Sequence, residues 1–310
     1  MKKKIKIWVT GHNGMLGSAI CRRLKKFQKF KVLKVSRKNL DLKKYNLVNA
    51  WLKKNKPDGI IIASAKVGGI YANNKYPVNF INDNILIQQN LINLGHLHKV
   101  KKLVFIGSSC VYPKMCNQPI KESYLLESQL EKTNEWYAIA KIAGIKLIQA
   151  YRKQFGSNFI TIMPTNLYGP NDNFHPMDSH VIPGLIGKIL KAKTNNEKLF
   201  KAWGTGNAKR DFLHVDDCAD AIIKCYQKYD DLEPINIGSG DEISIKQLIF
   251  MIANMTNYKG NIEFDPKSVG DGTPRKILDI SKITKLGWKP RIKLQSGLKS
   301  TIKWYKQNYL

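Results

Sequence analysis

The sequence lacks any long hydrophobic segment. It contains no apolar run of about 18 residues, which is close to the minimum for a helix that spans a membrane. Its first ten residues, MKKKIKIWVT, also lack the apolar stretch and the small-residue cleavage site of a secretory signal peptide. We therefore expect a cytoplasmic protein that neither spans nor binds a membrane.

Cysteines are few, and no two of them form a C-x-x-C pair. An odd and scattered set of this kind suits neither a disulfide framework nor a zinc site. We expect reduced thiols and no bound metal. The five cysteines are Cys21, Cys110, Cys116, Cys218 and Cys225.

Acidic residues and arginine are also scarce. The chain has 52 lysines and arginines against 23 aspartates and glutamates, and only seven of the cations are arginine. The formal net charge of +29 would attract nucleic acid, but arginine is the residue that forks onto phosphates and reads guanine. Because the lysines are spread along the whole chain, we interpret the charge as a solvated surface that attracts small anionic substrates.

Short apolar runs alternate with helical patterns over the first half of the chain. With 310 residues, 43% of them apolar, the chain can bury a sizeable core. The alternation is typical of an α/β fold in which helices cover both faces of a doubly wound parallel sheet. The apolar runs are 5–10, 31–36, 59–64, 102–107 and 159–164, and we expect helices from about residue 15, near 80–98 and near 135–154.

This alternation fades after the loop PTNLYGPNDNFHP, residues 164–176, which is rich in proline, asparagine and glycine. We place a domain change there, with residues 1–165 in the first domain and residues 166–310 mainly in a smaller α/β domain that contains a helix near 181–192. The segments FLHVDD (212–217) and EPINIGSG (233–240) resemble strand ends, so we expect the chain to return to the first sheet near 205–237.

The first apolar run leads into TGHNGMLGSAI, which predicts a dinucleotide site of the Rossmann type. Gly11, Gly14 and Gly17 form a G-x-x-G-x-x-G turn between a strand and a helix. Glycine permits the tight turn, and it lets the free N–H groups of the helix N-terminus approach a pyrophosphate. The strand before the turn and the helix after it make this motif specific.

The residues after the second apolar run favour NADPH over NADH. A site for NAD usually offers Asp or Glu to the ribose 2′-hydroxyl about 20 residues beyond the glycines. Here the chain has Ser36, Arg37 and Lys38, and two cations with a hydroxyl suit a 2′-phosphate better. Asp41 is the acidic residue that would reverse this assignment.

Two further motifs predict proton transfer. The run LVFI is followed by GSSCVYPK, which puts Ser108, Ser109 and Cys110 at the end of a buried strand. The segment NEWYAIAK places Tyr137 and Lys141 one helical turn apart, where an ammonium would lower the pKa of the phenol. Tyr71 and Lys75 have the same spacing but no serine strand end before them, so the context selects Tyr137.

The order of the glycine turn, the serine strand end and the Tyr137–Lys141 pair resembles the extended short-chain dehydrogenase/reductase family. Longer blocks narrow the resemblance to the NADPH-dependent 3,5-epimerase/4-reductases that convert GDP-4-keto-6-deoxy-D-mannose to GDP-L-fucose. The chain departs from that pattern at Asn13, where arginine is common, and at Trp136, where proline is common. The blocks include AKVGGIYANNKYPVNFI (65–81), EKTNEWYAIAK (131–141), MPTNLYGPNDNFHP (163–176), SHVIP (179–183), RDFLHVDD (210–217) and DGTPRK (271–276).

The chemistry of such a reaction accounts for a cysteine beside two serines. The hydrogens on C3 and C5 of a 4-keto sugar are both alpha to the carbonyl, and inversion needs a base on one face and an acid on the other. The resemblance implies Cys110 and His180 for these roles, and which of them is the acid stays open. His175 is the rival to His180, and Ser109 is the rival to Ser108.

The resemblance also implies residues for reduction and binding. Ser108 and Tyr137 hold the C4 oxygen, Tyr137 supplies its proton, and Lys141 holds the nicotinamide ribose. The remaining residues that the resemblance adds for NADPH are Met15, Leu16, Pro164, Asn166, Leu167 and His180. Those for the GDP-sugar are Lys188, Trp203, Arg210 and Asp271.

Two alternatives remain at this point. One is a C4-reductase of a related GDP-4-keto sugar, such as a 6-deoxy-heptose for surface polysaccharide, which leaves epimerisation to another protein. The other is a non-catalytic protein of the dinucleotide fold that binds RNA, for which the net charge is the motive. By analogy with the family, we expect a homodimer that joins through the helices near 80–98 and 135–154.

Overall fold

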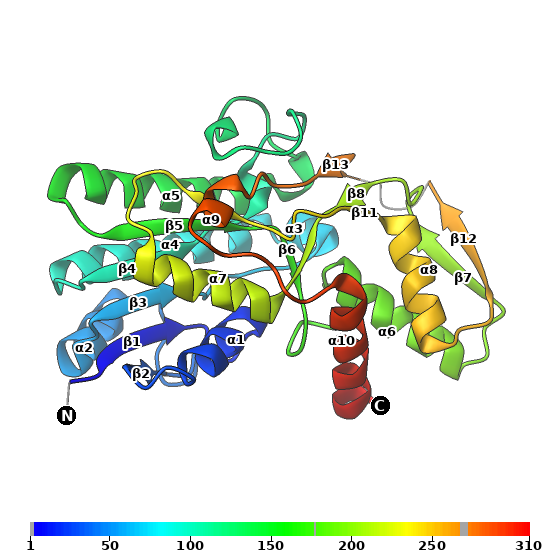
Figure 1. Cartoon of the computed structure of the whole chain (residues 1–310), viewed down its shortest axis with the longest axis horizontal. Coiled ribbons are helices and arrows are strands. Elements are labelled where there is room, and N and C mark those ends of the chain that lie inside the picture. The colour runs from blue at the N-terminus through cyan, green and yellow to red at the C-terminus, as the bar shows by residue number, and fades with distance from the viewer. Residues whose placement is uncertain (1–2, 177, 267–271) are drawn as a thin grey trace.

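The fold is built on a parallel sheet of six strands in the order β10-β5-β4-β3-β1-β2. A computed structural model describes residues 3–176, 178–266 and 272–310 of the chain (Figure 1). Every pairing within the sheet is parallel, which confirms the expected α/β class. Its strands are β1 (Ile5–Thr10), β2 (Phe30–Leu33), β3 (Gly59–Ile62), β4 (Lys102–Ile106), β5 (Phe159–Pro164) and β10 (Ile235–Ile237).

The direction of winding reverses at β1, which lies between β2 and β3. In doubly wound sheets, ligands bind at such a switch point, beyond the carboxyl ends of the strands. Here Thr10 at the end of β1 and Ser64 just after β3 share a hydrogen bond of 2.8 Å between their hydroxyl oxygens. The glycine turn follows Thr10 directly, so it lies at the switch point.

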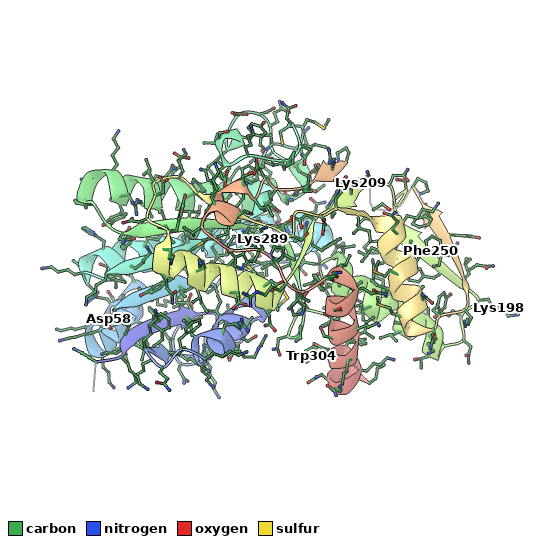
Figure 2. All side chains as sticks on the ribbon, viewed as in Figure 1. Asp58, Lys198, Lys209, Phe250, Lys289 and Trp304 are labelled. Atoms are coloured by element: carbon green, nitrogen blue, oxygen red, sulfur yellow. The ribbon has the colours of Figure 1, made fainter. Side chains whose placement is uncertain are left out.

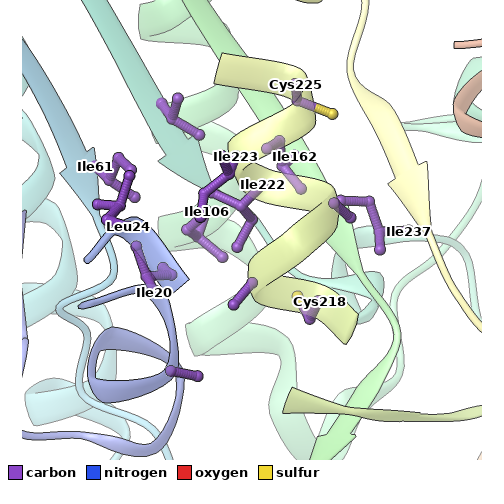
Figure 3. Packing of buried hydrophobic residues seen from close by; sticks show 14 of the residues in the cluster. Ile20, Leu24, Ile61, Ile106, Ile162, Cys218, Ile222, Ile223, Cys225 and Ile237 are labelled. Atoms are coloured by element: carbon purple, nitrogen blue, oxygen red, sulfur yellow. The ribbon is translucent and has the colours of Figure 1, made fainter. Parts of the chain in front are cut away.

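Helices cover both faces of this sheet, and a hydrophobic core lies between the sheet and the helices on each face. Successive side chains of a strand point to opposite faces, so a strand contributes to both cores. In β4, Val104 and Ile106 belong to the core on one face, whereas Leu103 and Phe105 belong to the core on the other. Figure 3 shows the first of these cores, where Ile222 and its neighbours pack on the sheet. The first face is covered by α1 (Met15–Leu24) and α7 (Val215–Lys228), and the second by α2 (Tyr45–Asn55), α4 (Pro77–Leu97) and α5 (Glu135–Phe155).

A second group of helices and short strands packs around its own hydrophobic core beside the carboxyl edge of the sheet, at the right of Figure 1. Its helices α6 (Val181–Thr194), α8 (Ile245–Thr256) and α10 (Leu294–Tyr309) surround buried residues such as Ile186, Ile252 and Leu298. Its strands are β7 (Leu199–Trp203), which pairs with β12 (Asn261–Asp265), and β8 (Lys209–Arg210), which pairs with β11 (Ile243–Ser244) and β13 (Arg275–Lys276).

The chain returns to the first sheet once in the region where the sequence predicted it. Residues 235–237 form β10 at the edge of the sheet, next to β5. The segment FLHVDD does not join that sheet, because its strand β9 (Phe212–His214) pairs with β6 (Asn166–Tyr168) and its remaining residues begin α7. That part of the prediction is wrong, because a short apolar run does not specify which strand it pairs with.

The other described elements are short. They are α3 (Ile70–Lys75), α9 (Ser281–Lys285) and the 3₁₀ helices η1 (Ser109–Val111), η2 (Glu122–Tyr124) and η3 (Lys132–Asn134). None of the helices in the described ranges has both the length and the apolar character needed to cross a bilayer. Figure 2 shows Lys198, Lys209 and Lys289 well apart on the surface, in keeping with dispersed positive charge.

Candidate active site

A cleft of about 870 Å³ runs from the switch point of the sheet to the second core. One wall consists of the residues that follow β1, β3, β4 and β5, and the other is formed by α6, β7 and β8. A volume of this size accommodates a large ligand, and the position is the one where doubly wound folds bind nucleotides.

The glycine turn lies in this cleft with the geometry that a pyrophosphate site requires. Gly11 has a φ of +67°, and a Cβ on Gly17 would stand 2.1 Å from the Gly11 carbonyl oxygen. Gly14 caps α1 without a side-chain hydrogen bond, and no acidic residue stands in the first turn. The N-terminus of α1, including Met15 and Leu16, therefore offers its N–H groups to the cleft. Asn13 lines the cleft as well.

The candidate residues for a 2′-phosphate divide into two groups. Arg37 and Asp41 line the cleft, whereas Ser36 and Lys38 do not. The Ser36 carbonyl accepts hydrogen bonds of 3.0 Å from two backbone N–H groups that follow it, which turns the chain away from β2. The Asp41 carboxylate accepts the Lys43 N–H at 3.1 Å, so part of its hydrogen-bonding capacity is used within its own loop.

Ser108, Cys110 and Tyr137 meet at the carboxyl end of β4. The Ser108 hydroxyl oxygen accepts the Cys110 N–H at 3.2 Å and caps η1, and a hydrogen bond also links Ser108 to the Tyr137 phenol. Desolvation raises the pKa of Tyr137, and the nearby Cys110 thiol acts in the same direction. Ser109 is buried, whereas Ser108 is partly open to the cleft. Trp136 is exposed and does not line the cleft.

Lys141 is buried beneath this group. Its ammonium donates a hydrogen bond of 2.8 Å to the Ile106 carbonyl oxygen and stands 5.8 Å from the centre of the Tyr137 ring. Burial lowers the pKa of Lys141 to about 7. We predicted from the sequence that Lys141 would lower the pKa of Tyr137; the structure gives the opposite direction, because desolvation of the phenol dominates.

His180 lines the opposite side of the cleft, at the N-cap of α6. Its side chain is open to the solvent of the cleft, but the surrounding protein desolvates the imidazole and lowers its pKa. The rival His175 does not line the cleft, and its Nδ1 lies 3.6 Å from the Asp178 carboxylate. The geometry therefore brings His180, and not His175, to the same cavity as Cys110.

Residues expected at the two ends of the ligand also line the cleft. Pro164, Asn166 and Leu167 line the cleft on the side of the first sheet. The Asn166 amide donates a hydrogen bond of 2.9 Å to the Asp211 carbonyl oxygen. At the far end, the Lys188 ammonium stands 3.4 Å above the centre of the Trp203 ring, and Arg210 also lines the cleft. Burial lowers the pKa of Lys188. Asp271 lies outside the described residues.

The structure adds a cleft residue that sequence reasoning missed. The Asp172 side chain is only 7% exposed, and although Oδ1 accepts the Asn173 N–H at 2.8 Å, Oδ2 has no hydrogen-bond partner. Burial raises the pKa of this carboxyl to about 7. Its only signal in the sequence was its place within MPTNLYGPNDNFHP, where one acid stands among asparagine and proline.

Comparisons with known proteins agree with this geometry. A GDP-L-fucose synthase of Arabidopsis thaliana is 49% identical over 99% of this chain and 94% of its own. Among solved structures, a GDP-L-fucose synthetase from Naegleria fowleri bound to NADP has a TM-score of 0.91 at 30% identity, over 100% of this chain and 96% of its own. A GDP-6-OMe-4-keto-L-xylo-heptose reductase from Campylobacter jejuni has a TM-score of 0.93 at 33% identity, over 99% of each chain.

The family model for NAD dependent epimerases and dehydratases matches residues 7–238, which include the glycine turn, Ser108, Tyr137, Lys141 and His180. With this match and relatives that align over nearly its whole length, the chain belongs to the NAD dependent epimerase/dehydratase family.

Proposed function

We propose that this chain is an NADPH-dependent 3,5-epimerase/4-reductase that converts GDP-4-keto-6-deoxy-D-mannose to GDP-L-fucose. The observation that carries the proposal is a single cleft in which Ser108, Cys110 and Tyr137 face a cavity that His180 also lines. The names of the similar synthases support the choice of substrate. The alternative of a non-catalytic RNA-binding module offers no use for these four side chains.

Epimerisation uses the thiol and the imidazole. Because the pKa of His180 is lowered, its imidazole is mainly neutral at pH 7 and can accept a proton, and it can donate one after protonation. Cys110 adjoins the Ser108–Tyr137 pair and so lies beside the carbon next to the carbonyl that this pair holds. Either residue can remove the proton while the other returns one, and the Ser108 and Tyr137 hydroxyls stabilise the enolate oxygen.

Reduction uses the same oxygen. The raised pKa of Tyr137 keeps the phenol protonated, so it can hydrogen-bond the C4 oxygen and then donate its proton to the alkoxide. Lys141 has a pKa of about 7 and is held by the Ile106 carbonyl, which positions it to bind a ribose hydroxyl. NADPH, when bound, supplies the hydride for C4. The glycine turn, the uncapped N-terminus of α1 and Arg37 suit its phosphates.

Binding of the GDP moiety falls to the far end of the cleft. Lys188 and Arg210 provide cations for the diphosphate, and Trp203, which is 43% exposed, has a ring face available for packing. Asp271 is proposed as a carboxylate for hydroxyl groups on the sequence resemblance alone. Residues 1–165 with the returning segment would bind the cofactor, and residues 166–310 mainly the GDP-sugar.

The assembly and the location belong to the same proposal. We expect a homodimer in the cytoplasm that binds neither nucleic acid nor membrane, with α4 and α5 at the dimer interface. The two helices pack side by side on one face of the sheet, with Leu97 and Phe155 exposed near their ends. Light scattering tests the assembly, because a solution mass of 35.4 kDa, that of one chain, would contradict it.

One alternative has a specific observation in its favour. The similar structure from Campylobacter jejuni is described as a reductase of a GDP-keto-heptose, and it covers 99% of this chain. If this chain were a C4-reductase alone, Cys110 and His180 would be present without a proton-transfer role. The two functions therefore differ in what removal of His180 does to the product.

Paired histidine variants test the proposed function. His180→Asn should lower GDP-L-fucose formation from GDP-4-keto-6-deoxy-D-mannose by roughly 10²-fold or more, because it removes one partner of the proton transfer. His98→Asn is the matched control, since His98 follows α4 and does not line the cleft, and it should retain wild-type turnover. Reduction of a GDP-4-keto-heptose at equal rates by wild type and His180→Asn, with no GDP-L-fucose formed by either, would establish the reductase instead.

A further inference from the structure

The segment between β6 and α6 carries several residues that line the cleft, among them Asp172 and His180, on irregular backbone. We define the β6–α6 segment as residues 169–176 and 178–180. His180 is its last residue and the N-cap of α6, without a side-chain capping bond of its own. The placement of the imidazole therefore depends on what fixes the backbone of this segment.

Within the described ranges, hydrogen bonds join the segment to α1 and to the loop after β3. The Asn171 amide donates a hydrogen bond of 3.3 Å to the Ser18 hydroxyl of α1 at an exposed position. The Gly69 N–H donates one of 3.1 Å to the Asp178 carbonyl oxygen, which joins the segment to the loop after β3. Water can replace hydrogen bonds of this kind, so each stabilises the segment only modestly.

An apolar contact lies between these two points. The Phe174 side chain is buried, and three aromatic residues of α10 surround its ring. The ring centroids lie 5.7 Å from Trp304, 4.8 Å from Tyr305 and 5.5 Å from Tyr309. We call these four residues the aromatic cluster, and Figure 2 shows Trp304 on α10.

The cluster is bound together beyond its contacts with Phe174. The Tyr305 and Tyr309 rings stack with centroids 5.0 Å apart, and Trp304 meets Tyr309 edge-on at 6.0 Å. The Tyr305 hydroxyl also lies close to α6, only 3.5 Å from where a Cβ on Gly187 would stand. Three of these aromatic contacts join Phe174 to α10, and aromatic pairs stabilise beyond their buried area, so the cluster is an apolar attachment of the β6–α6 segment to α10.

We propose that the aromatic cluster makes Phe174, Trp304 and Tyr305 positioning residues for His180, so that the C-terminal helix controls the epimerisation half of the reaction. This inference rests on the proposed function. Ser108 is the N-cap of η1, just after β4, and Tyr137 and Lys141 lie on α5; these elements carry no residue of the cluster. Loosening the cluster therefore displaces the imidazole and leaves the reducing group and the cofactor turn in place.

The test is the rate at which the enzyme exchanges the C3 and C5 hydrogens of GDP-4-keto-6-deoxy-D-mannose with heavy water. NADP⁺ is present to fill the cofactor site without a hydride to transfer. Trp304→Leu should lower the exchange rate per folded molecule about tenfold or more, because a displacement of the imidazole near 1 Å is costly for proton transfer. The dissociation constant for NADPH should rise by a smaller factor than the exchange rate falls, because the glycine turn and Arg37 keep their places in the cleft.

Two control variants separate positioning from general loss of stability. Trp304→Phe keeps an aromatic ring in the cluster and should restore most of the exchange. Leu298→Ala removes a buried side chain of the same helix that lies outside the cluster, so it should lower the melting temperature without lowering exchange per folded molecule. Exchange by Trp304→Leu at the wild-type rate would overturn the inference.

A second measurement keeps the inference testable if wild type itself exchanges no substrate hydrogen, which would count against the proposed function. Amide hydrogen exchange read by mass spectrometry reports the opening of peptides that cover residues 171–184. The inference predicts faster exchange there in Trp304→Leu, with wild-type behaviour in Trp304→Phe and no selective change in Leu298→Ala. Equal protection of these peptides in all four proteins would contradict the cluster's role whatever the reaction is.

Discussion

At the scale of single residues, environment decides what the reactive groups can do. Tyr137 and Lys141 were identified by spacing and context, and both line the cleft. The spacing also suggested that the ammonium would ease ionisation of the phenol, whereas burial raises the pKa of Tyr137 and lowers that of Lys141 to about 7. A sequence shows which residues are close along a helix, but desolvation depends on what the remaining chain packs around them.

Arg37 tests the cofactor at this scale. Arg37→Ala should raise the KM for NADPH roughly 10-fold or more, because it removes a charge-assisted contact to the 2′-phosphate, and should change the KM for NADH by less than about twofold. Steady-state kinetics with both cofactors measures the difference. Lys38→Ala is the matched control, since Lys38 is a neighbouring exposed cation that does not line the cleft. Equal effects of Arg37→Ala on both cofactors would remove the basis for preferring NADPH.

Asp172 makes stability depend on pH in an unusual direction. Its pKa is raised from 3.8 to about 7 in the folded protein, so the folded state holds a proton that the unfolded state has lost between these values. The protonated carboxyl therefore contributes to the free energy of unfolding. This contribution is fully present below about pH 4, and the free energy of unfolding falls by roughly 2–4 kcal/mol as the pH rises to about 7.

Asp172→Asn removes this contribution because the amide does not titrate. The difference in unfolding free energy between variant and wild type should therefore shift in favour of the variant as the pH rises from about 4.5 to 7.5. Urea unfolding across this range measures it, and other titrating groups cancel in the difference. A difference that stays constant with pH would show that Asp172 titrates normally.

At the scale of elements, the sequence predicted strands better than their partners. Residues 5–10 and 159–164 form β1 and β5 as expected, because an apolar run bounded by turn residues is a local signal. The run 31–36 gives a strand only to Leu33, because the chain turns at Ser36. The pairing of β9 with β6 and the contacts of Phe174 with α10 join distant segments, so no local pattern indicated them.

The junction of β1 and α1 allows a test with a built-in control. A Cβ on Gly17 would overlap the Gly11 carbonyl, whereas a Cβ on Gly14 would make an ordinary contact at 3.4 Å with the same oxygen. Gly17→Ala should therefore lower the free energy of unfolding by about 2–4 kcal/mol, and Gly14→Ala by less than about 1 kcal/mol. Denaturant unfolding of the two proteins decides this, and equal stabilities would mean that the turn is not tightly packed.

At the scale of the whole molecule, the first sheet and its helices hold Ser108, Tyr137, Lys141 and the glycine turn, while the second core brings His180, Lys188 and Trp203 to the same cleft. The alternation of strands and helices was sufficient to predict the first of these parts. The second was expected only from the loss of that alternation, and its ligand residues only from the family resemblance, because its short strands and mixed pairings have no periodic signal in the sequence. The dispersed lysines are compatible with a surface that attracts a GDP-sugar.

The central claim is that one cleft both inverts C3 and C5 and reduces C4. The most direct measurement is incubation of the wild-type protein with GDP-4-keto-6-deoxy-D-mannose and NADPH in heavy water, followed by NMR and mass analysis of the product. The account predicts GDP-L-fucose that carries deuterium at both C3 and C5. A reduced product without deuterium at those carbons would contradict it, because Cys110 and His180 would then transfer no proton.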